Sequence, residues 1–355
     1  MVYNRKYGII NEKHEMLRTY QKEDIIMNIL VTGGAGYIGS HTCVALLEAG
    51  HTVVIVDNLC NSKVETIDKI KQISNKEVTF YEIDVTHEAA LDDIFSKNSI
   101  DGVIHFAGLK AVGESVAKPL EYYYNNLVST MVLSKICRKY GVKKFVFSSS
   151  ATVYGDNISP FVENMTLLPT TNPYGETKAM SERILTDICK VNPDFSVALL
   201  RYFNPVGAHE SGLIGEAPNG IPNNLMPYIT KVAKGELEKL RVFGNDYETV
   251  DGTGVRDYIH VLDLADGHVA ALNNLSEGVH VYNLGTGEGT SVLQLLKAFE
   301  EANDIKLPYE IVDRRPGDIA TCYADASKAK KELGWTATRG IIEMCRDAWR
   351  FEKGL

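Results

Sequence analysis

Short apolar, β-branched runs alternate with longer helical stretches between Met27 and Asn204. This is the pattern of a parallel sheet covered by helices on both faces, and six such strands predict a doubly wound α/β fold. The predicted strands span residues 28–32, 52–57, 78–84, 102–107, 144–149 and 197–203. Helices are predicted near residues 37–49, 62–73, 87–97, 119–140 and 173–190, each followed by the Gly, Pro or Asn that commonly ends a helix.

The pattern changes after Asn204, where Gly, Pro and Asn accumulate in residues 205–224 (PVGAHESGLIGEAPNGIPNN). Such a stretch cannot easily form a long regular element, so it predicts an ordered binding loop or a domain junction. Shorter helices and strands follow up to Leu355. We therefore predict a Rossmann domain over residues 27–204 and a smaller C-terminal α/β substrate domain over residues 205–355, partly interleaved with the first.

Residues 1–26 form an extension of mixed charge that lacks the apolar segment and cleavage site of a secretory signal. The triplet Lys22-Glu23-Asp24 can be encoded by a string that resembles a ribosome-binding site, just upstream of the codon for Met27. We therefore expect native translation to begin at Met27. The alternative is a genuine short N-terminal arm.

The composition narrows the possible partners. Of the 355 residues 45% are apolar and 23% are charged, as in soluble globular proteins. No apolar run reaches the roughly 18 residues that a membrane span requires. The net charge is −9 and no long Lys/Arg block is present. We therefore expect neither a membrane nor a nucleic-acid partner.

The cysteines predict neither a disulfide framework nor a metal site. They include no CxxC pair and no neighbouring His at zinc-ligand spacing, so we interpret them as reduced core thiols. Such usage fits a cytoplasmic protein. The six residues are Cys43, Cys60, Cys137, Cys189, Cys322 and Cys345.

The first predicted strand runs directly into a glycine-rich turn, GGAGYIG, spanning residues 33–39. Glycine lets such a turn adopt positive φ and approach a pyrophosphate, while the following helix offers free N–H groups. Asp57 ends the second strand 18 positions after Gly39, close to the about 20 expected for a carboxylate that bonds an adenine ribose 2′-hydroxyl. Because that carboxylate would repel a 2′-phosphate, NAD is favoured over NADP.

Two further segments end strands at the same predicted edge of the sheet. Asp84 ends the third strand, and residues 106–108 (Phe-Ala-Gly) end the fourth. Ligands of doubly wound folds sit at this edge, which makes both segments candidates for the dinucleotide site. The alternative for Asp84 is a helix N-cap ahead of residues 85–97.

A candidate acid/base pair opens the helix near residues 173–190. Tyr174 and Lys178 share one helix face because they are four residues apart, and Ser150 ends the fifth strand. A free phenol has a pKa near about 10. We expect the adjacent ammonium and an oxidised nicotinamide ring to lower the pKa of Tyr174 toward neutrality, which would make it the general acid/base. Any helix can contain YxxxK by chance, but here it follows a GxxGxxG turn and a strand-end serine.

Together these three motifs resemble the extended short-chain dehydrogenase/reductase superfamily. Longer segments narrow the resemblance to the UDP-glucose 4-epimerase family, among the NAD-dependent epimerases/dehydratases. The matches run from Asn28 to near Trp349. They include FAGLKAVGESV (106–116), FSSSATVYGD (147–156), LLRYFNPVGAH (199–209), GIPNNLMPYI (220–229) and GTGVRDYIHVLDLADGH (252–268).

The resemblance implies a role for each matching position. Ser150 would bond the sugar 4-oxygen, Tyr174 would take its proton, and Lys178 would bind the nicotinamide ribose. With these three, the implied NAD site comprises Gly33, Gly36, Tyr37, Ile38, Gly39, Asp57, Asn58, Asn61, Ser62, Asp84, Val85, Phe106, Ala107, Lys110, Asn125 and Phe203. The implied UDP-sugar site comprises Asn204, Asn224, Leu225, Arg241, Phe243, Arg256, Tyr258, Arg315, Asp318 and Cys322. For the arginines, the alternative is a surface ion pair.

The implied activity is an isomerase reaction of galactose metabolism. Hydride would leave the sugar C4 for tightly bound NAD, giving a 4-keto sugar that turns over and receives hydride on its opposite face. Cys322 lies where some members of the family carry a small residue and others Tyr, which implies additional UDP-GlcNAc/UDP-GalNAc activity; the alternative is that Cys322 is packed core. The family resemblance also implies a homodimer, through helices near residues 119–140 and 173–190.

Two other functions share part of this pattern. A nucleotide-sugar 4,6-dehydratase or decarboxylase shares the NAD site and YxxxK, but commonly adds an Asp-Glu pair after the strand-end Ser/Thr. Here that place reads Ala151-Thr152, which argues for epimerisation. A catalytically silent NAD-binding sensor is the alternative of a different class, and the presence of Ser150, Tyr174 and Lys178 argues against it.

Overall fold

The structure is a computed structural model that describes residues 26–220, 222, 224–315 and 318–354. The proposed N-terminal extension lies outside these ranges except for Ile26, so its interpretation stays a prediction. None of the helices within the described ranges is long and apolar enough to cross a membrane.

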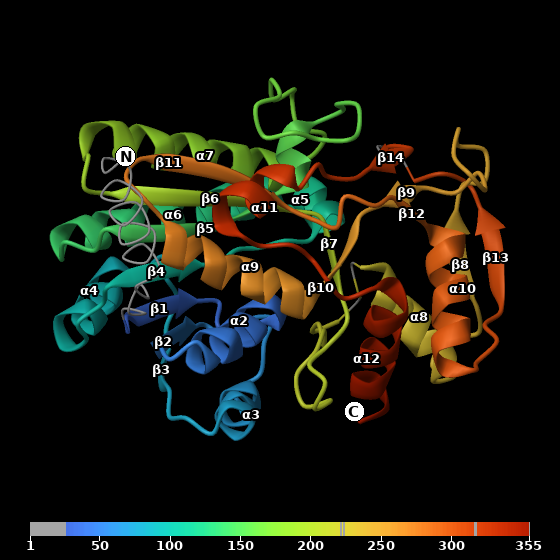
Figure 1. The fold of residues 1–355 in the computed structure, drawn as a ribbon, viewed down its shortest axis with the longest axis horizontal. Coiled ribbons are helices and arrows are strands. Elements are labelled where there is room, and N and C mark those ends of the chain that lie inside the picture. The colour runs from blue at the N-terminus through green and yellow to red at the C-terminus, as the bar shows by residue number, and fades with distance from the viewer. Residues whose placement is uncertain (1–25, 221, 223, 316–317, 355) are drawn as a thin grey trace, which may run out of the picture.

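Seven parallel strands form the main sheet of the described chain, in the order β11-β6-β5-β4-β1-β2-β3 (Figure 1). Because the order reverses between β4 and β1, the sheet is doubly wound, and the predicted fold class is confirmed. The sequence predicted six strands, whereas this sheet has seven. The additional strand, β11, comes from the part of the chain that follows Asn204. The strands are β1 (Asn28–Thr32), β2 (Thr52–Asp57), β3 (Thr79–Glu82), β4 (Gly102–His105), β5 (Lys144–Ser150), β6 (Ser196–Tyr202) and β11 (Val279–Leu284).

Helices cover both faces of this sheet, and successive residues of β1 point into two different cores. Ile29 and Val31 pack in one cluster, whereas Leu30 packs in the other. This explains why the strands are nearly continuous apolar runs. One face carries α2 (Tyr37–Glu48), α3 (Glu65–Ser74), α9 (Val261–Asn274) and α11 (Ser327–Leu333), and the other carries α4 (Glu88–Lys97), α6 (Pro119–Lys139) and α7 (Pro173–Val191).

Two short elements near the sheet edge were not expected from the sequence. They are α5 (Val112–Ala117) and the 3₁₀ turn η1 (Ala151–Tyr154), which follows β5 directly. The long helices begin as predicted: Pro occupies the first turn of α6 and of α7, where its missing N–H costs no hydrogen bond. Asn172 caps α7, since its side chain accepts a hydrogen bond from Gly175 N at 2.9 Å.

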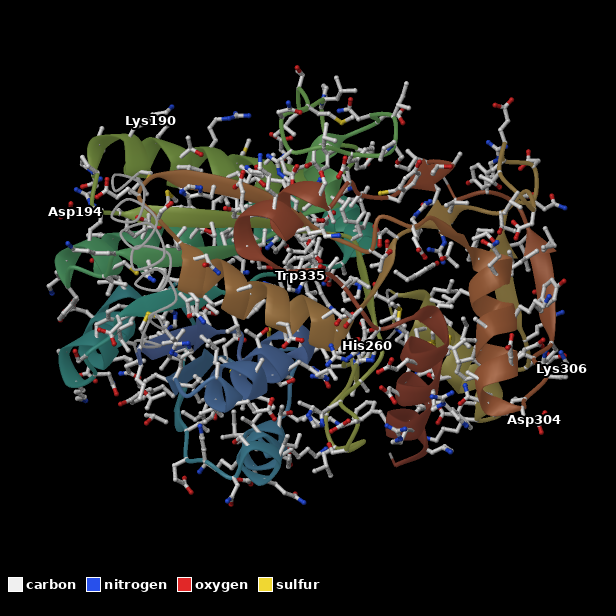
Figure 2. All side chains as sticks on the ribbon, in the orientation of Figure 1. Lys190, Asp194, His260, Asp304, Lys306 and Trp335 are labelled. Atoms are coloured by element: carbon white, nitrogen blue, oxygen red, sulfur yellow. The ribbon has the colours of Figure 1, made fainter. Side chains whose placement is uncertain are left out.

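A smaller lobe lies beside the sheet and has its own apolar core (Figure 1). His260, labelled in Figure 2, lies where this lobe meets the sheet, capping α9 and approaching Asp347 of α12 at 3.3 Å. The proposed division at residue 204 stays a prediction. The lobe and its junction contain α8 (Leu225–Ala233), α10 (Val292–Asn303), α12 (Ile341–Lys353), β7 (Asn204–Val206), β8 (Leu240–Phe243), β9 (Val255–Arg256), β10 (Tyr258–His260), β12 (Thr290–Ser291), β13 (Tyr309–Val312) and β14 (Thr321–Cys322).

Candidate active site

The glycine-rich turn connects β1 to α2 at the carboxyl edge of the sheet. Gly33 has a φ of 70°, and a Cβ there would lie 2.8 Å from the backbone nitrogen of Ala107. A Cβ on Gly39 would lie 2.2 Å from the carbonyl oxygen of Gly33. The N-cap of α2, Gly36, makes no side-chain capping bond, so the first N–H groups of the helix remain available to an anion.

Asp57 lies beside this turn and is almost fully buried. Its carboxylate accepts hydrogen bonds from Ala35 N at 3.1 Å, Leu59 N at 2.9 Å and the Ser62 hydroxyl at 2.8 Å. An ionised carboxylate offers about four lone-pair sites. Asp57 is thus held rigidly by the loop and keeps acceptor capacity for a hydroxyl group.

Asp84 lies close to the same loop. It accepts hydrogen bonds from Thr86 N at 2.8 Å and Asn58 Nδ2 at 3.0 Å. Since α4 begins at Glu88 with His87 as its N-cap, the alternative of Asp84 as a helix cap is wrong.

A cavity of about 370 Å³ opens along this edge of the sheet. Every residue proposed for the NAD site lines it, from Gly33 in the turn to Lys110 after β4 and Phe203 after β6. Distant sequence segments meet here; for example, the Tyr37 hydroxyl donates to the Gly207 carbonyl, 170 positions later, at 2.7 Å. The cavity therefore has the lining expected of a dinucleotide site.

Ser150, Tyr174 and Lys178 lie together on the wall of this cavity. Ser150 Oγ accepts hydrogen bonds from Thr152 N at 3.2 Å and Thr152 Oγ1 at 3.0 Å, so its own hydroxyl hydrogen remains to be donated. Lys178 Nζ donates to the Ser148 carbonyl at 2.6 Å and lies 5.9 Å from the centroid of the Tyr174 ring. The three side chains thus come from β5 and α7 as the sequence predicts.

The expected lowering of the Tyr174 pKa does not occur in the polypeptide itself. Burial raises the pKa of Tyr174, and the hydrogen bond with Ser150 opposes this only in part. Burial also lowers the pKa of Lys178 to about 8, partly opposed by the charge of Glu182. The predicted lowering also includes the charge of an oxidised nicotinamide ring, so it stays a prediction; desolvation, which the prediction omitted, opposes it.

The residues proposed for UDP-sugar form separate groups, and among them only Asn224 lines the cavity. Arg241 on β8 and Arg315, three residues after β13, lie 5.9 and 4.0 Å from the ring centroid of Phe243. Arg241 also approaches Glu310 Oε1 at 3.8 Å and is mostly exposed. The surface ion pair considered as an alternative for Arg241 is therefore present.

A second group surrounds β9 and β14. Arg256 Nη2 lies 3.4 Å from Asp318 Oδ1, and Cys322 is the register partner of Arg256. Cys322 is partly buried against an apolar cluster, as its alternative role in packing requires. The neighbouring strands pair Asn204 with Tyr258, and Leu225 begins α8.

The cysteines are all free, but not all are core residues. Cys60 is exposed and lies at the dinucleotide cavity, which corrects the expectation of core thiols there. Cys43, Cys137, Cys189 and Cys345 are buried.

Three acids near the site, two of them buried and one nearly so, were missed by sequence reasoning. Glu182 lies four residues after Lys178 on α7, so helical spacing could have identified it. Asp257 accepts hydrogen bonds from Thr286, Gly287 and Ala324, and an acid just ahead of the apolar strand β10 was a usable signal. Glu216 lies in the loop of residues 205–224, where no periodic pattern marks it.

The fold and this cavity define a dinucleotide-binding α/β protein of the short-chain dehydrogenase/reductase type. Residues 29–285 match the NAD dependent epimerase/dehydratase family. The chain belongs to that family.

Similar proteins cover nearly the whole chain. The UDP-glucose 4-epimerase of Bacillus subtilis is 62% identical over 329 residues, which are 92% of this chain and 97% of that protein. The crystal structure of UDP-glucose 4-epimerase from Bifidobacterium longum in complex with NAD⁺ and UDP is 56% identical, with a TM-score of 0.89 and coverage of 92% of this chain and 98% of that one. That of UDP-glucose 4-epimerase from Stenotrophomonas maltophila, with bound NAD and formylated UDP-arabinopyranose, is 49% identical, with a TM-score of 0.90 and the same coverage.

Proposed function

We propose that this chain is a UDP-glucose 4-epimerase that interconverts UDP-galactose and UDP-glucose through a 4-keto intermediate. The observation that carries the proposal is the placement of Ser150, Tyr174 and Lys178 on the cavity that every proposed NAD residue lines. The identity of 62% to the enzyme of Bacillus subtilis supports this particular reaction.

The residues of the cavity fit NAD. The close approach of Gly33 to Ala107 leaves no room for a side chain, and the uncapped first turn of α2 suits a pyrophosphate. Asp57 suits the adenine ribose and disfavours a 2′-phosphate. When bound, NAD would supply a hydride acceptor for the sugar C4 and, once reduced, the hydride donor for the return transfer.

The side chains divide the proton chemistry among them. Tyr174 takes the proton of the sugar 4-hydroxyl and later returns it, because its side chain forms a hydrogen bond with Ser150 and its ring centroid lies 5.9 Å from Lys178 Nζ. Ser150 accepts from Thr152, so its hydroxyl hydrogen is the one to be donated, which favours charge on the oxygen that it faces. Lys178 donates one N–H to the Ser148 carbonyl, and its other N–H groups remain available to ribose hydroxyls.

The proposed UDP contacts suit a sugar that must turn over. The arginines and asparagines named above would hold the nucleotide, since guanidinium groups bind phosphate in two-point fashion. Strong anchoring of UDP with few sugar contacts leaves the keto sugar free to present either face. At the place where dehydratases commonly carry acids, Ala151 and Thr152 open η1, and neither carries a carboxyl group that could protonate a leaving 6-hydroxyl.

The test is purified protein with UDP-galactose and no added NAD, following formation of UDP-glucose. We expect conversion, because each cycle regenerates the cofactor. Absence of conversion by protein that contains NAD would overturn the proposal in favour of a silent sensor. Formation of a 4-keto-6-deoxy product would favour the dehydratase instead.

Substrate range is a second point to test. We propose that UDP-GlcNAc and UDP-GalNAc are also accepted, because Cys322 leaves more space than Tyr would. The change Cys322→Tyr should reduce turnover of UDP-GlcNAc by at least about tenfold relative to UDP-galactose. Strong turnover of UDP-glucose with none of UDP-GlcNAc by the unchanged enzyme would contradict this.

We further propose a cytoplasmic homodimer. Six free thiols support the compartment. On α6, Leu120, Tyr124 and Met131 are 79%, 67% and 46% exposed, and their spacing places them on one helix face, as a helix-mediated interface requires. Light scattering on the purified protein tests the dimer, and a monomeric mass would contradict it.

A further inference from the structure

Glu216 is a nearly buried carboxylate on the wall of the dinucleotide cavity, and the proposed reaction gives it no role. Only 10% of its side chain is exposed. Burial raises its pKa, and the neighbouring Lys110 and Asn224 oppose that rise. A buried acid is costly unless it is paired, so these two partners stabilise it.

One oxygen of Glu216 meets both partners. Oε1 accepts a hydrogen bond from Asn224 Nδ2 at 2.6 Å and lies 3.5 Å from Lys110 Nζ. Lys110 follows β4 and belongs to the proposed NAD site, whereas Asn224 precedes α8 and belongs to the proposed UDP site. A single atom therefore connects the two halves of the proposed active site.

The segment that carries Glu216 is fixed on both sides. Ile214 is buried in the core of the sheet, and a Cβ on Gly215 would lie 2.4 Å from the ring of Phe351 on α12. Further along, Asn219 N donates to Asn61 Oδ1, in the loop after β2, at 3.1 Å. Residues 214–219 thus form a strap that lines the cavity and is anchored at both ends, and the backbone of Glu216 cannot shift without moving these anchors.

We propose that Glu216 is a positioning residue that couples binding of the cofactor to binding of the nucleotide of the substrate. UDP on Asn224 holds the strap in place, and the strap holds Lys110 over the cofactor. The inference rests on the proposed function, because only then do Lys110 and Asn224 contact NAD and UDP. Coupling of this kind is reciprocal, so it can be measured from either ligand.

The experiment measures the rate at which NAD is lost from the purified holoenzyme, with and without saturating UDP. We expect UDP to slow the loss by about fivefold or more in the unchanged enzyme. In Glu216→Ala the ratio of the two rates should fall below about twofold. A merely structural role would change both rates together and leave their ratio unaltered.

Two further variants keep the test decisive. Glu210→Gln removes an exposed carboxylate from the same loop and should keep the original ratio. Glu216→Gln keeps the shape of the natural residue and loses its charge. It replaces Glu216→Ala if that variant does not fold, and we expect it to lose at least half of the coupling between UDP and NAD. An original ratio in either Glu216 variant, or a ratio of one in the unchanged enzyme, overturns the inference.

The proposed function is checked in the same preparation by conversion of UDP-galactose. Conversion with unaltered coupling in the variants refutes the role of Glu216 alone. Protein that contains no NAD and converts no UDP-galactose refutes the proposed function and the inference with it.

Discussion

The carboxylate of Glu182 and the guanidinium of Arg201 form a two-point ion pair beneath the proposed catalytic helix. Arg201 Nε donates to Oε1 at 2.9 Å and Nη2 donates to Oε2 at 2.6 Å, and both side chains are nearly buried. Oε1 also accepts a hydrogen bond from the Ser149 hydroxyl at 2.5 Å. The pair thus joins α7 to the ends of β5 and β6, where Ser150 and Lys178 must be held.

Changing Glu182 to Gln should strongly destabilise the protein. It leaves the guanidinium of Arg201 buried without a counter-charge, which typically costs about 3–5 kcal/mol. Denaturant unfolding measures the loss. As a control, Asp187→Asn breaks an exposed pair with Lys190 on the same helix and should cost less than about 1 kcal/mol. Equal unfolding midpoints for the two variants would show that the buried pair contributes no more to the free energy of unfolding than the exposed pair does.

Changing Tyr174 to Phe should separate chemistry from binding. The ring stays in place against Lys178, but the hydroxyl that exchanges the proton is lost. We expect turnover of UDP-galactose to fall by about 10²–10⁴-fold with bound NAD retained, as measured by coupled assay and by cofactor content. Tyr309→Phe, at a half-exposed position of β13, serves as the control. Turnover of Tyr174→Phe within tenfold of the original would remove Tyr174 from the proposed role.

Lys178 predicts a pH dependence of stability whose sign follows from its pKa. Burial lowers that pKa from 10.5 to about 8. Below pH 8 the residue is protonated in the folded and the unfolded chain, and burying its charge costs free energy. Between pH 8 and 10.5 the unfolded chain holds the proton and the folded chain does not. The free energy of unfolding due to this group therefore rises with pH, by up to about 1.4 kcal/mol per unit.

The comparison that isolates this effect is the unchanged protein against Lys178→Met, unfolded in urea at several pH values from 7.5 to about 10. The difference in unfolding free energy should shift in favour of the unchanged protein as pH rises. Lys190→Met, at an exposed position of the same helix, should show no such shift. A difference between wild type and Lys178→Met that is independent of pH would refute the lowered pKa.

Much of the fold was predictable because its signals are local. The strand Asn28–Thr32 is apolar on both faces, and the turn after it needs glycine, so residue type alone marks both. The spacing of Tyr174 and Lys178 is likewise fixed by one helix. Strand β11 was missed because it joins the sheet from a part of the chain that follows a long loop, and no local pattern states which sheet a late strand will join.

The remaining features depend on distances and burial that no spacing encodes. The contact of Glu216 with Lys110 joins residues 106 positions apart, and it exists only because the strap lines the cavity. The rise in the Tyr174 pKa depends on the balance between desolvation and one hydrogen bond. Residue types predicted which neighbours lower the pKa of Tyr174, but the fold determines whether their effect or that of desolvation is larger.

Gly33 gives the most direct test of the turn itself. Its φ of 70° disfavours any residue with a Cβ, by roughly 1–2 kcal/mol. A Cβ would also press on the nitrogen of Ala107, which cannot easily retreat because it donates to Thr32 Oγ1 at 3.3 Å. Gly33→Ala should therefore lower stability and yield purified protein with little NAD, measured by cofactor absorbance after gel filtration. Gly113→Ala, where a Cβ meets open space, should retain both properties. Full NAD content in Gly33→Ala would show that the cofactor does not depend on this turn.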